Sequence, residues 1–322
     1  MFDSIIQFFA GIPFFQSVFF GIAAMVIVGS SWCVVGLVMG NAPKNGVQTD
    51  LVQGISAVFS VIIGFIMLVI FNAWSTSTPL VTFLVCLTLA IVGILNFIML
   101  QIMSHAMQSG PNGIIWAIIQ SALVFPFIGG IVFFNVQLTF LRLSGIIALL
   151  SALILFALAK DNTSKGGSRW KVEAFIALAI TGVLQNLSNA PAYFQEARGV
   201  SSIIRALALV AGTVAAAVCW NLFNGKGDSW QKIKATRRNK KTWLYIGALQ
   251  LFGIIFSSIL MYPGMNVMAD HGMGGMCYPV MVGSCIISFT LTSIFMLKEK
   301  IRCNQIFALL VCLAGLMLIC TD

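Results

Sequence analysis

The sequence predicts an all-α polytopic membrane protein. Of its 322 residues 59% are hydrophobic and only 8% are charged, whereas a soluble domain carries about 25% charged residues. The apolar residues gather into ten stretches, most of them close to the ~20 residues that a helix needs to cross a bilayer. Polar and apolar residues do not alternate along them, as they would in the strands of a membrane barrel. Because no aqueous fold buries so much apolar surface, we expect lipid as the solvent and helices as the spans.

Short polar connections separate the spans and set their limits. In chain order we expect transmembrane helices over residues 16–39, 51–73, 80–104, 113–134, 140–159, 171–191, 200–223, 242–266, 275–297 and 302–320. The longest connections, 160–171 and 224–241, are too short to fold alone. We therefore expect no soluble domain and no enzyme activity on such a domain.

The first segment, residues 1–15, is apolar but short. It lacks the positively charged start and the small-residue cleavage site of a secretory signal peptide. We expect a re-entrant or interfacial segment here, and an eleventh span or a frayed tail are the alternatives.

The eight cysteines provide no framework for disulfides or metals. Most of them lie inside predicted spans, no C-x-x-C pair occurs, and buried cysteine behaves as a small hydrophobic residue. The nucleotide-binding motif G-x-x-x-x-G-K-[ST] does not occur either. We therefore expect no metal site, no cofactor and no direct use of ATP.

Basic residues are distributed unequally between the connections. Fifteen of the 18 Lys and Arg residues lie in the odd-numbered connections, and only Arg142, Arg198 and Arg205 lie on the opposite side. By the positive-inside rule the odd-numbered connections face the cytoplasm. We therefore expect a plasma (inner) membrane protein with both termini outside, and the net charge of +9 needs no nucleic-acid partner.

The two halves of the chain resemble each other. Gly110 and Gly113 come before the fourth span as Gly272 and Gly275 come before the ninth, 162 residues later. Each half then closes with one further apolar span, so the chain divides into two repeats of five helices. The expected domains are the N-terminal segment 1–15, a first repeat 16–160 and a second repeat 161–322.

An odd number of spans in each repeat inserts the second repeat upside down. The charge distribution agrees, because corresponding connections fall on opposite sides of the membrane. Inverted repeats around a shared central cavity are the architecture of alternating-access transporters. The repeat therefore favours a transporter.

Three short motifs occur along the chain. They are Trp32 in the first span, Gly93 to Asn96 in the third, and Leu297-Lys298-Glu299 before the last. With the five plus five spans, these motifs resemble the drug/metabolite transporter superfamily and its EamA-like fold. The stretches NLSNAPAYFQEARGV and FMLKEK are similar to the L-rhamnose–proton symporter branch of that superfamily. The resemblance implies proton-coupled transport of a sugar-like solute.

Polar side chains inside lipid are costly, and each needs either a partner or a function. Amides form hydrogen bonds with hydroxyl groups, and aromatic faces stack on sugar rings or cations, so a mixture of both suits a neutral polar solute. The candidate substrate-binding residues are Trp32, Asn96, Gln101, Trp116, Gln120, Gln185, Asn186, Asn189, Arg205, Tyr262, Asn266 and Tyr278. For any one of them the alternative is a packing contact between helices, and for the set we expect a central cavity near mid-membrane.

Few ionisable residues lie in or near the predicted spans. Asp270 and His271 end the eighth span on the predicted outer side, and they are the first candidates for coupling because His titrates near neutral pH. A solvated helix end is the alternative. Glu196 with Arg205 is the second candidate, since Arg stays charged and needs a partner. That partner is Glu196 or the carboxylate of an anionic substrate.

These observations favour a secondary transporter of a small polar metabolite, with a sugar as the first choice and with proton coupling. A same-fold exporter of amino acids, nucleosides or drugs is the second hypothesis, and a non-transporting membrane protein is the third. A membrane-embedded enzyme is disfavoured, because two distant histidines supply neither a nucleophile–base pair nor a metal site. The expected partners are the solute, the lipid bilayer and a proton or other coupling ion, with a homodimer left open.

Overall fold

The computed structural model of the chain is built from helices. It describes residues 17–125, 128–129, 132, 139–158, 169–224, 234, 236, 238–251, 260–261, 264, 267–268, 271, 277–296, 298 and 303–320. Every regular element over these residues is an α-helix or a short helix of the 3-10 or π type. The all-α prediction is therefore confirmed for this part of the chain.

The helices follow the apolar stretches of the sequence closely. Those of the first half are α2 (Val18–Asn41), α3 (Thr49–Ile70), α4 (Pro79–Ser109), α5 (Asn112–Gln120, continued by η3, Ser121–Leu123) and α7 (Phe140–Leu158). Those of the second half are α8 (Arg169–Tyr193), α9 (Ser202–Asn224), α11 (Lys240–Leu249), α13 (Cys277–Phe295) and α14 (Cys303–Cys320). Short helices also occur at η2 (Pro43–Asn45) and η4 (Gln195–Gly199). Each long helix begins within two residues of a predicted start.

Polar residues just outside the apolar stretches fix where helices begin. The Ser17 hydroxyl accepts a hydrogen bond from the Phe20 backbone at 3.3 Å and caps α2. Thr78 is the N-cap residue of α4, and Pro79 occupies the first turn, where the missing backbone donor has no cost. These caps explain why the helix starts were predictable from the sequence.

The outer surface of this helical array is apolar. Among the described residues, the four helices α2, α3, α4 and α9 are long and apolar enough to cross a membrane by length and composition. Large apolar side chains stay uncovered along them, with Phe65 57%, Phe83 61% and Phe223 88% exposed. Exposed apolar surface on this scale needs a non-aqueous neighbour. The architecture is that of an all-α membrane protein.

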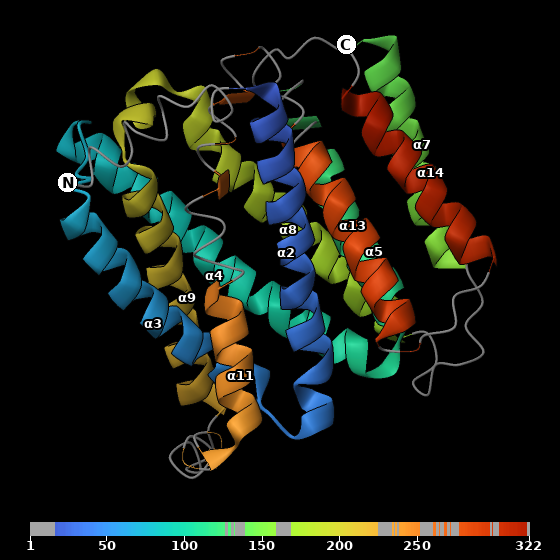
Figure 1. The fold of residues 1–322 in the computed structure, drawn as a ribbon, viewed down its shortest axis with the longest axis horizontal. Coiled ribbons are helices and arrows are strands. Elements are labelled where there is room, and N and C mark those ends of the chain that lie inside the picture. Colours follow the sequence, from blue (N-terminus) through green and yellow to red (C-terminus); the bar gives the residue numbers. More distant parts are fainter. Residues whose placement is uncertain are drawn as a thin grey trace.

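Helices from the two halves of the chain pack on one another rather than forming two separate bundles. The main pairings between halves are α7 with α14, α3 with α9, α2 with α13, and α4 with both α8 and α9. Figure 1 shows α7 and α14 side by side at one edge and α3 beside α9 at the other, with α2, α8 and α13 between them. The core therefore lies between the halves.

The pairing of α4 with α9 depends on glycine. A Cβ atom on Gly93 would lie 1.8 Å from the carbonyl oxygen of Leu209, and one on Gly212 would lie 1.9 Å from that of Ala90. The Thr213 hydroxyl donates to the Gly93 carbonyl at 3.2 Å across the same contact. The two backbones approach this closely only because neither glycine carries a side chain.

Helix α4 is longer than the sequence predicted. We expected its end near residue 104, where polar residues begin, but the helix continues to Ser109. The added turn packs against the start of α8, and this contact sustains the helix beyond the apolar stretch. At 31 residues α4 is about 46 Å long, and it crosses the molecule obliquely in Figure 1.

Hydrogen bonds tie connections together at both ends of the molecule. At one end Ser77 donates to the Glu196 carbonyl at 2.6 Å and Ser201 donates to the Ala73 carbonyl at 2.5 Å. We call this set the Ser77 clasp. It joins the connection after α3 to the connection after α8.

At the other end Asn45 is the centre of a second set. Its Nδ2 donates to the Tyr245 hydroxyl at 2.9 Å, and its Oδ1 accepts from Lys241 Nζ at 2.5 Å. We call this set the Asn45 clasp. It joins the connection after α2 to the start of α11.

Candidate functional site

Trp116 lies where the two halves meet. It is the fifth residue of α5, it is 4% exposed, and its ring stacks on that of Phe289 with centroids 5.0 Å apart and planes at 28°. Its Nε1–H donates to Cys285 Sγ at 3.3 Å. Both partners belong to α13, so this tryptophan connects the fourth predicted span to the ninth.

Helix α2 approaches this aromatic pair at Gly36. A Cβ atom there would lie 2.5 Å from Phe289 Cε2 and 2.8 Å from Trp116 Cε3. The glycine therefore lets the α2 backbone rest directly on the two rings. Three helices from both halves meet at one aromatic centre.

The other candidates on α5 and α8 are amides. Gln120 is 8% exposed and lies one helical turn beyond Trp116. On α8 the Asn186 Nδ2 donates to the Gly182 carbonyl at 2.9 Å, so this amide is partly used within its own helix. The Gln185 Oε1 is buried without a hydrogen-bond partner.

Two further candidates lie on other helices, α2 and α4. Trp32 of α2 is half-buried and packs against the main core. It also packs against a smaller apolar cluster that includes Met25 of α2 and Met281 of α13. Asn96 of α4 is also half-buried, three residues after Gly93. The Asn96 motif therefore coincides with the close approach of α4 to α9 described above.

A polar stripe on α3 was not anticipated. Thr49, Gln53, Ser56 and Ser60 are all buried, with between 4% and 8% of each residue exposed. Their spacing of four, three and four residues places them on one face of the helix. We call these four residues the α3 polar stripe. The spacing is visible in the sequence, but none of these four residues was among the predicted candidates.

The two ends of the stripe contact different helices. The Thr49 hydroxyl donates to Gln101 Oε1 on α4 at 2.9 Å, which places a predicted candidate beside the stripe. At the far end Gln250 Nε2 donates to Ser56 Oγ at 2.7 Å, and Ser60 donates to Gln250 Oε1 at 3.1 Å. A line of amides and hydroxyls thus runs along the inner face of α3.

The ionisable candidates lie at the Ser77 clasp end. Arg205 Nη2 donates to the Ala197 carbonyl at 2.5 Å, so a backbone oxygen is one partner of this guanidinium. The Glu196 side chain is exposed, and its backbone carbonyl takes part in the clasp. His271 is exposed, and its Nδ1 lies 2.9 Å from the Val267 carbonyl.

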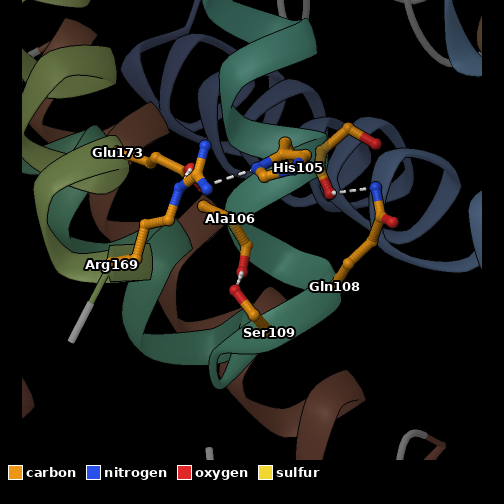
Figure 2. Close-up of polar contacts among 7 residues, drawn as sticks. His105, Ala106, Gln108, Ser109, Arg169 and Glu173 are labelled. Carbon is orange, nitrogen blue, oxygen red and sulfur yellow. Dashed lines mark hydrogen bonds and ion pairs between the residues drawn. The ribbon is translucent and has the colours of Figure 1, made fainter. Parts of the chain in front are cut away.

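An ion-pair cluster that was not among the candidates lies at the opposite end. His105 Nδ1 and Glu173 Oε2 are 2.8 Å apart, and Arg169 Nε donates to Glu173 Oε1 at 3.0 Å. Figure 2 shows the Glu173 carboxylate reaching from α8 towards both side chains. His105 directly follows the expected end of the third span at residue 104, and its partner lies 68 residues further along the chain.

Several candidates lie outside the described residues. Tyr262, Asn266 and Asp270 belong to this group. Asn189 and Tyr278 lie on described helices, but their side chains fall outside what the structure describes. Over the residues that are described, no three His, Cys, Asp or Glu side chains gather as metal ligands would.

Comparison with known proteins bears on the fold alone. No family model matches the chain, and no curated protein matches it. A solved structure described as "Crystal structure of protein" is similar over 92% of this chain and 96% of its own, with 15% sequence identity and a TM-score of 0.59. The two chains therefore share a fold over nearly their whole lengths.

Proposed function

We propose that the protein is a secondary transporter that carries a small, uncharged polar metabolite across a membrane by alternating access between two inverted five-helix repeats. The observation that carries the proposal is the reciprocal packing of the helices. In this reading α2, α3, α4, α5 and α7 of the first repeat correspond to α8, α9, α11, α13 and α14 of the second.

An inverted repeat requires every contact between the halves to have a counterpart. Three pairings join corresponding helices directly: α3 with α9, α5 with α13, and α7 with α14. Each remaining pairing has a counterpart in which every helix is replaced by the corresponding helix of the other repeat. The pair α2–α13 matches α8–α5, α4–α9 matches α11–α3, and α4–α8 matches α11–α2. This reciprocity supports a two-fold axis in the membrane plane.

The two clasps lie at opposite ends of the molecule. The Ser77 clasp joins the connections that follow the second and sixth helices of the proposed bundle, and the Asn45 clasp joins the connection that follows the first helix to the start of the eighth. In alternating access one end opens while the other stays closed. Two clasps at opposite ends are suitable closures for the two states.

The interior favours an uncharged solute. The buried polar side chains between the halves are mainly amides and hydroxyls, such as Gln120 and the α3 polar stripe. Amides and hydroxyls satisfy the donors and acceptors of a neutral solute, and the Trp116–Phe289 stack offers an aromatic surface beside them. The resemblance to the L-rhamnose–proton symporter branch makes a sugar the first choice.

We propose proton coupling, with Asp270 and His271 as the first candidates and Glu196 with Arg205 as the second. By the basic-residue distribution these groups face outside, together with both termini, in the plasma (inner) membrane. A coupled carrier needs proton binding and solute binding to shift each other reciprocally. A carboxylate beside an imidazole is a suitable proton site.

Transport in proteoliposomes tests the function. We expect uphill uptake of one of L-rhamnose, D-ribose or xylitol under an inward proton gradient, and loss of that accumulation when a protonophore is added. Asp270→Asn should abolish accumulation and leave solute exchange intact, while Asp228→Asn in the connection 224–241 is the matched control. Uptake that ignores both pH and sodium would indicate an uncoupled facilitator, and the absence of uptake for every solute class tested, amino acids and nucleosides included, would reject a transporter.

A further inference from the structure

We propose that Gln53 and Gln101 form an occluded subsite that binds one hydroxyl group of an uncharged solute, near the start of α3 and the end of α4. The inference rests on the proposed transport of such a solute. It assigns a binding role to Gln53 and to the first turns of the α3 polar stripe.

The two amides belong to one cluster. Thr49 donates to Gln101 Oε1 at 2.9 Å, and Gln53 lies one turn further along the same face of α3. Gln53 Nε2 contacts Met39 Sδ at 3.2 Å, while Ser104, one turn after Gln101, donates to the Met39 carbonyl at 2.8 Å. Contacts through Thr49 and Met39 therefore hold both amides at the same junction of α2, α3 and α4.

Each amide keeps one polar atom without a partner. Gln53 Oε1 is a buried acceptor and Gln101 Nε2 is a buried donor, and neither makes a hydrogen bond. The whole Gln53 residue is only 5% exposed, and its side-chain Nε2 donates to the thioether of Met39, which is a weak acceptor. Buried polar groups are normally hydrogen-bonded. We therefore infer that a bound ligand supplies the hydrogen bonds that the surrounding side chains do not make.

The chemistry of the two atoms defines the partner. Gln53 Oε1 needs a donor and Gln101 Nε2 needs an acceptor. A hydroxyl group supplies both. A carboxylate lacks the donor and an ammonium group lacks the acceptor, so neither satisfies the pair.

The charge around the cluster agrees with a neutral ligand. The charged or imidazole-bearing residues on α2, α3 and α4 are Asp50 and His105 alone. Asp50 is half-buried and lies three residues before Gln53, on a neighbouring part of the helix surface, and His105 is engaged with Glu173. An anionic ligand would meet the Asp50 carboxylate and no Lys or Arg on these three helices, so burying it would be costly.

The walls of the cluster can adapt to an occupant. Met39 and Met103 are fully buried beside the stripe, and methionine fills irregular space with a flexible side chain. Rotation of Met39 would release Gln53 Nε2 as well. The subsite is closed in this conformation and opens when α3 and α4 separate.

Binding of L-rhamnose, D-ribose and xylitol to the purified full chain in detergent tests the subsite. We expect a saturable rise of Tm at millimolar concentrations for at least one of the three, and weakening of its apparent Kd by about tenfold in Gln53→Met and in Gln101→Met. Because one hydroxyl joins both amides, the double variant should lose little more than either single variant. Gln48→Met, at the exposed N-cap of the same helix with no side-chain cap bond, is the matched control.

The thermal stability of the ligand-free variants distinguishes a binding role of Gln53 from a packing role. Gln53→Met removes a buried unpaired carbonyl, so Tm of the ligand-free protein should stay the same or rise, whereas a packing role predicts a fall. If Gln53→Met does not fold, Gln53→Asn withdraws the amide by one methylene and keeps its polarity. Wild-type affinity in these variants would assign the hydroxyl to a resident water and overturn the proposal, as would no saturable binding of any of the three solutes.

The outcome is distinguishable from failure of the proposed function. If the solute binds through Gln53 but is not carried across the proteoliposome membrane, the result rejects the proposed transport and supports the subsite. If the solute is transported and Gln53→Met leaves its Kd unchanged, the result rejects the subsite and supports the proposed transport. Stronger binding of succinate or glycine betaine, lost in Gln53→Met, would overturn the neutral class.

Discussion

The imidazole of His105 meets the carboxylate of Glu173 at 2.8 Å between Nδ1 and Oε2. The contact joins the end of α4 to the start of α8, which belong to different halves of the chain. The Glu173 side chain is 14% exposed and that of His105 is 59% exposed. The pair is thus a solvent-accessible bridge between the proposed repeats.

Glu173→Gln should lower the free energy of unfolding by less than about 1 kcal/mol, because exposed ion pairs contribute little and the amide keeps a hydrogen bond. If the pair helps to close this end of the molecule, His105→Ala and Glu173→Gln should speed solute release equally, and the double variant should add nothing further. Unfolding in detergent and efflux from proteoliposomes measure the two effects. Additive effects on efflux would show that the residues act separately.

Gly93→Ala and Gly212→Ala should each destabilise the protein by about 3 kcal/mol or more, because each new methyl group would meet backbone at under 2 Å. Gly247→Ala on α11 is the matched control, since nothing lies within 4 Å of its Cβ position. There alanine should stabilise the helix by up to about 1 kcal/mol. Thermal unfolding in detergent compares the three, and equal Tm values would contradict the close packing of α4 on α9.

Trp116→Ala should cost about 3–5 kcal/mol of stability, because it removes a buried ring that stacks on Phe289. Trp116→Phe should cost less, since it keeps the stacked surface and loses the indole donor to Cys285. Cys285→Ala, which removes the acceptor alone, serves as the comparison for that loss. A Trp116→Phe variant as unstable as Trp116→Ala would mean that the hydrogen bond outweighs the stack.

Orientation can be read from two exposed positions, Lys44 and Thr76, which lie at opposite ends of the molecule. With the eight native cysteines replaced, a membrane-impermeant maleimide should label Thr76→Cys in intact cells. Lys44→Cys should be labelled only after permeabilisation, because the basic connections are expected to face the cytoplasm. The reverse pattern would invert the proposed topology.

The helix starts were predictable because length, apolarity and polar flanking residues are local properties of the sequence. The end of α4 was not, because its added turn depends on contact with α8. The same difference between local properties and tertiary contacts applies to the candidate site residues. The position of Trp116 in the fourth span was predictable, whereas its burial between the halves and its stack on Phe289, 173 residues further along the chain, depend on how the halves pack.

The α3 polar stripe shows another limit of sequence reasoning. Thr49, Gln53, Ser56 and Ser60 lie in a stretch that is apolar on average, and average hydropathy hides the face on which polar residues gather. Their spacing carried the signal. The unpaired atoms of Gln53 and Gln101 are a tertiary property, which no local pattern reports.

The unequal lengths of the helices impose a condition on the lipid. Over the described residues α7 and α14 comprise 19 and 18 residues and span about 28 Å and 27 Å, close to the ~30 Å thickness of the hydrocarbon layer. Helix α4 is about 46 Å long and fits that layer only by tilting or projecting. Motion that changes the tilt of α4 therefore changes hydrophobic mismatch around this helix and leaves the α7–α14 edge matched. Acyl-chain length thus becomes a determinant of which conformation the membrane favours.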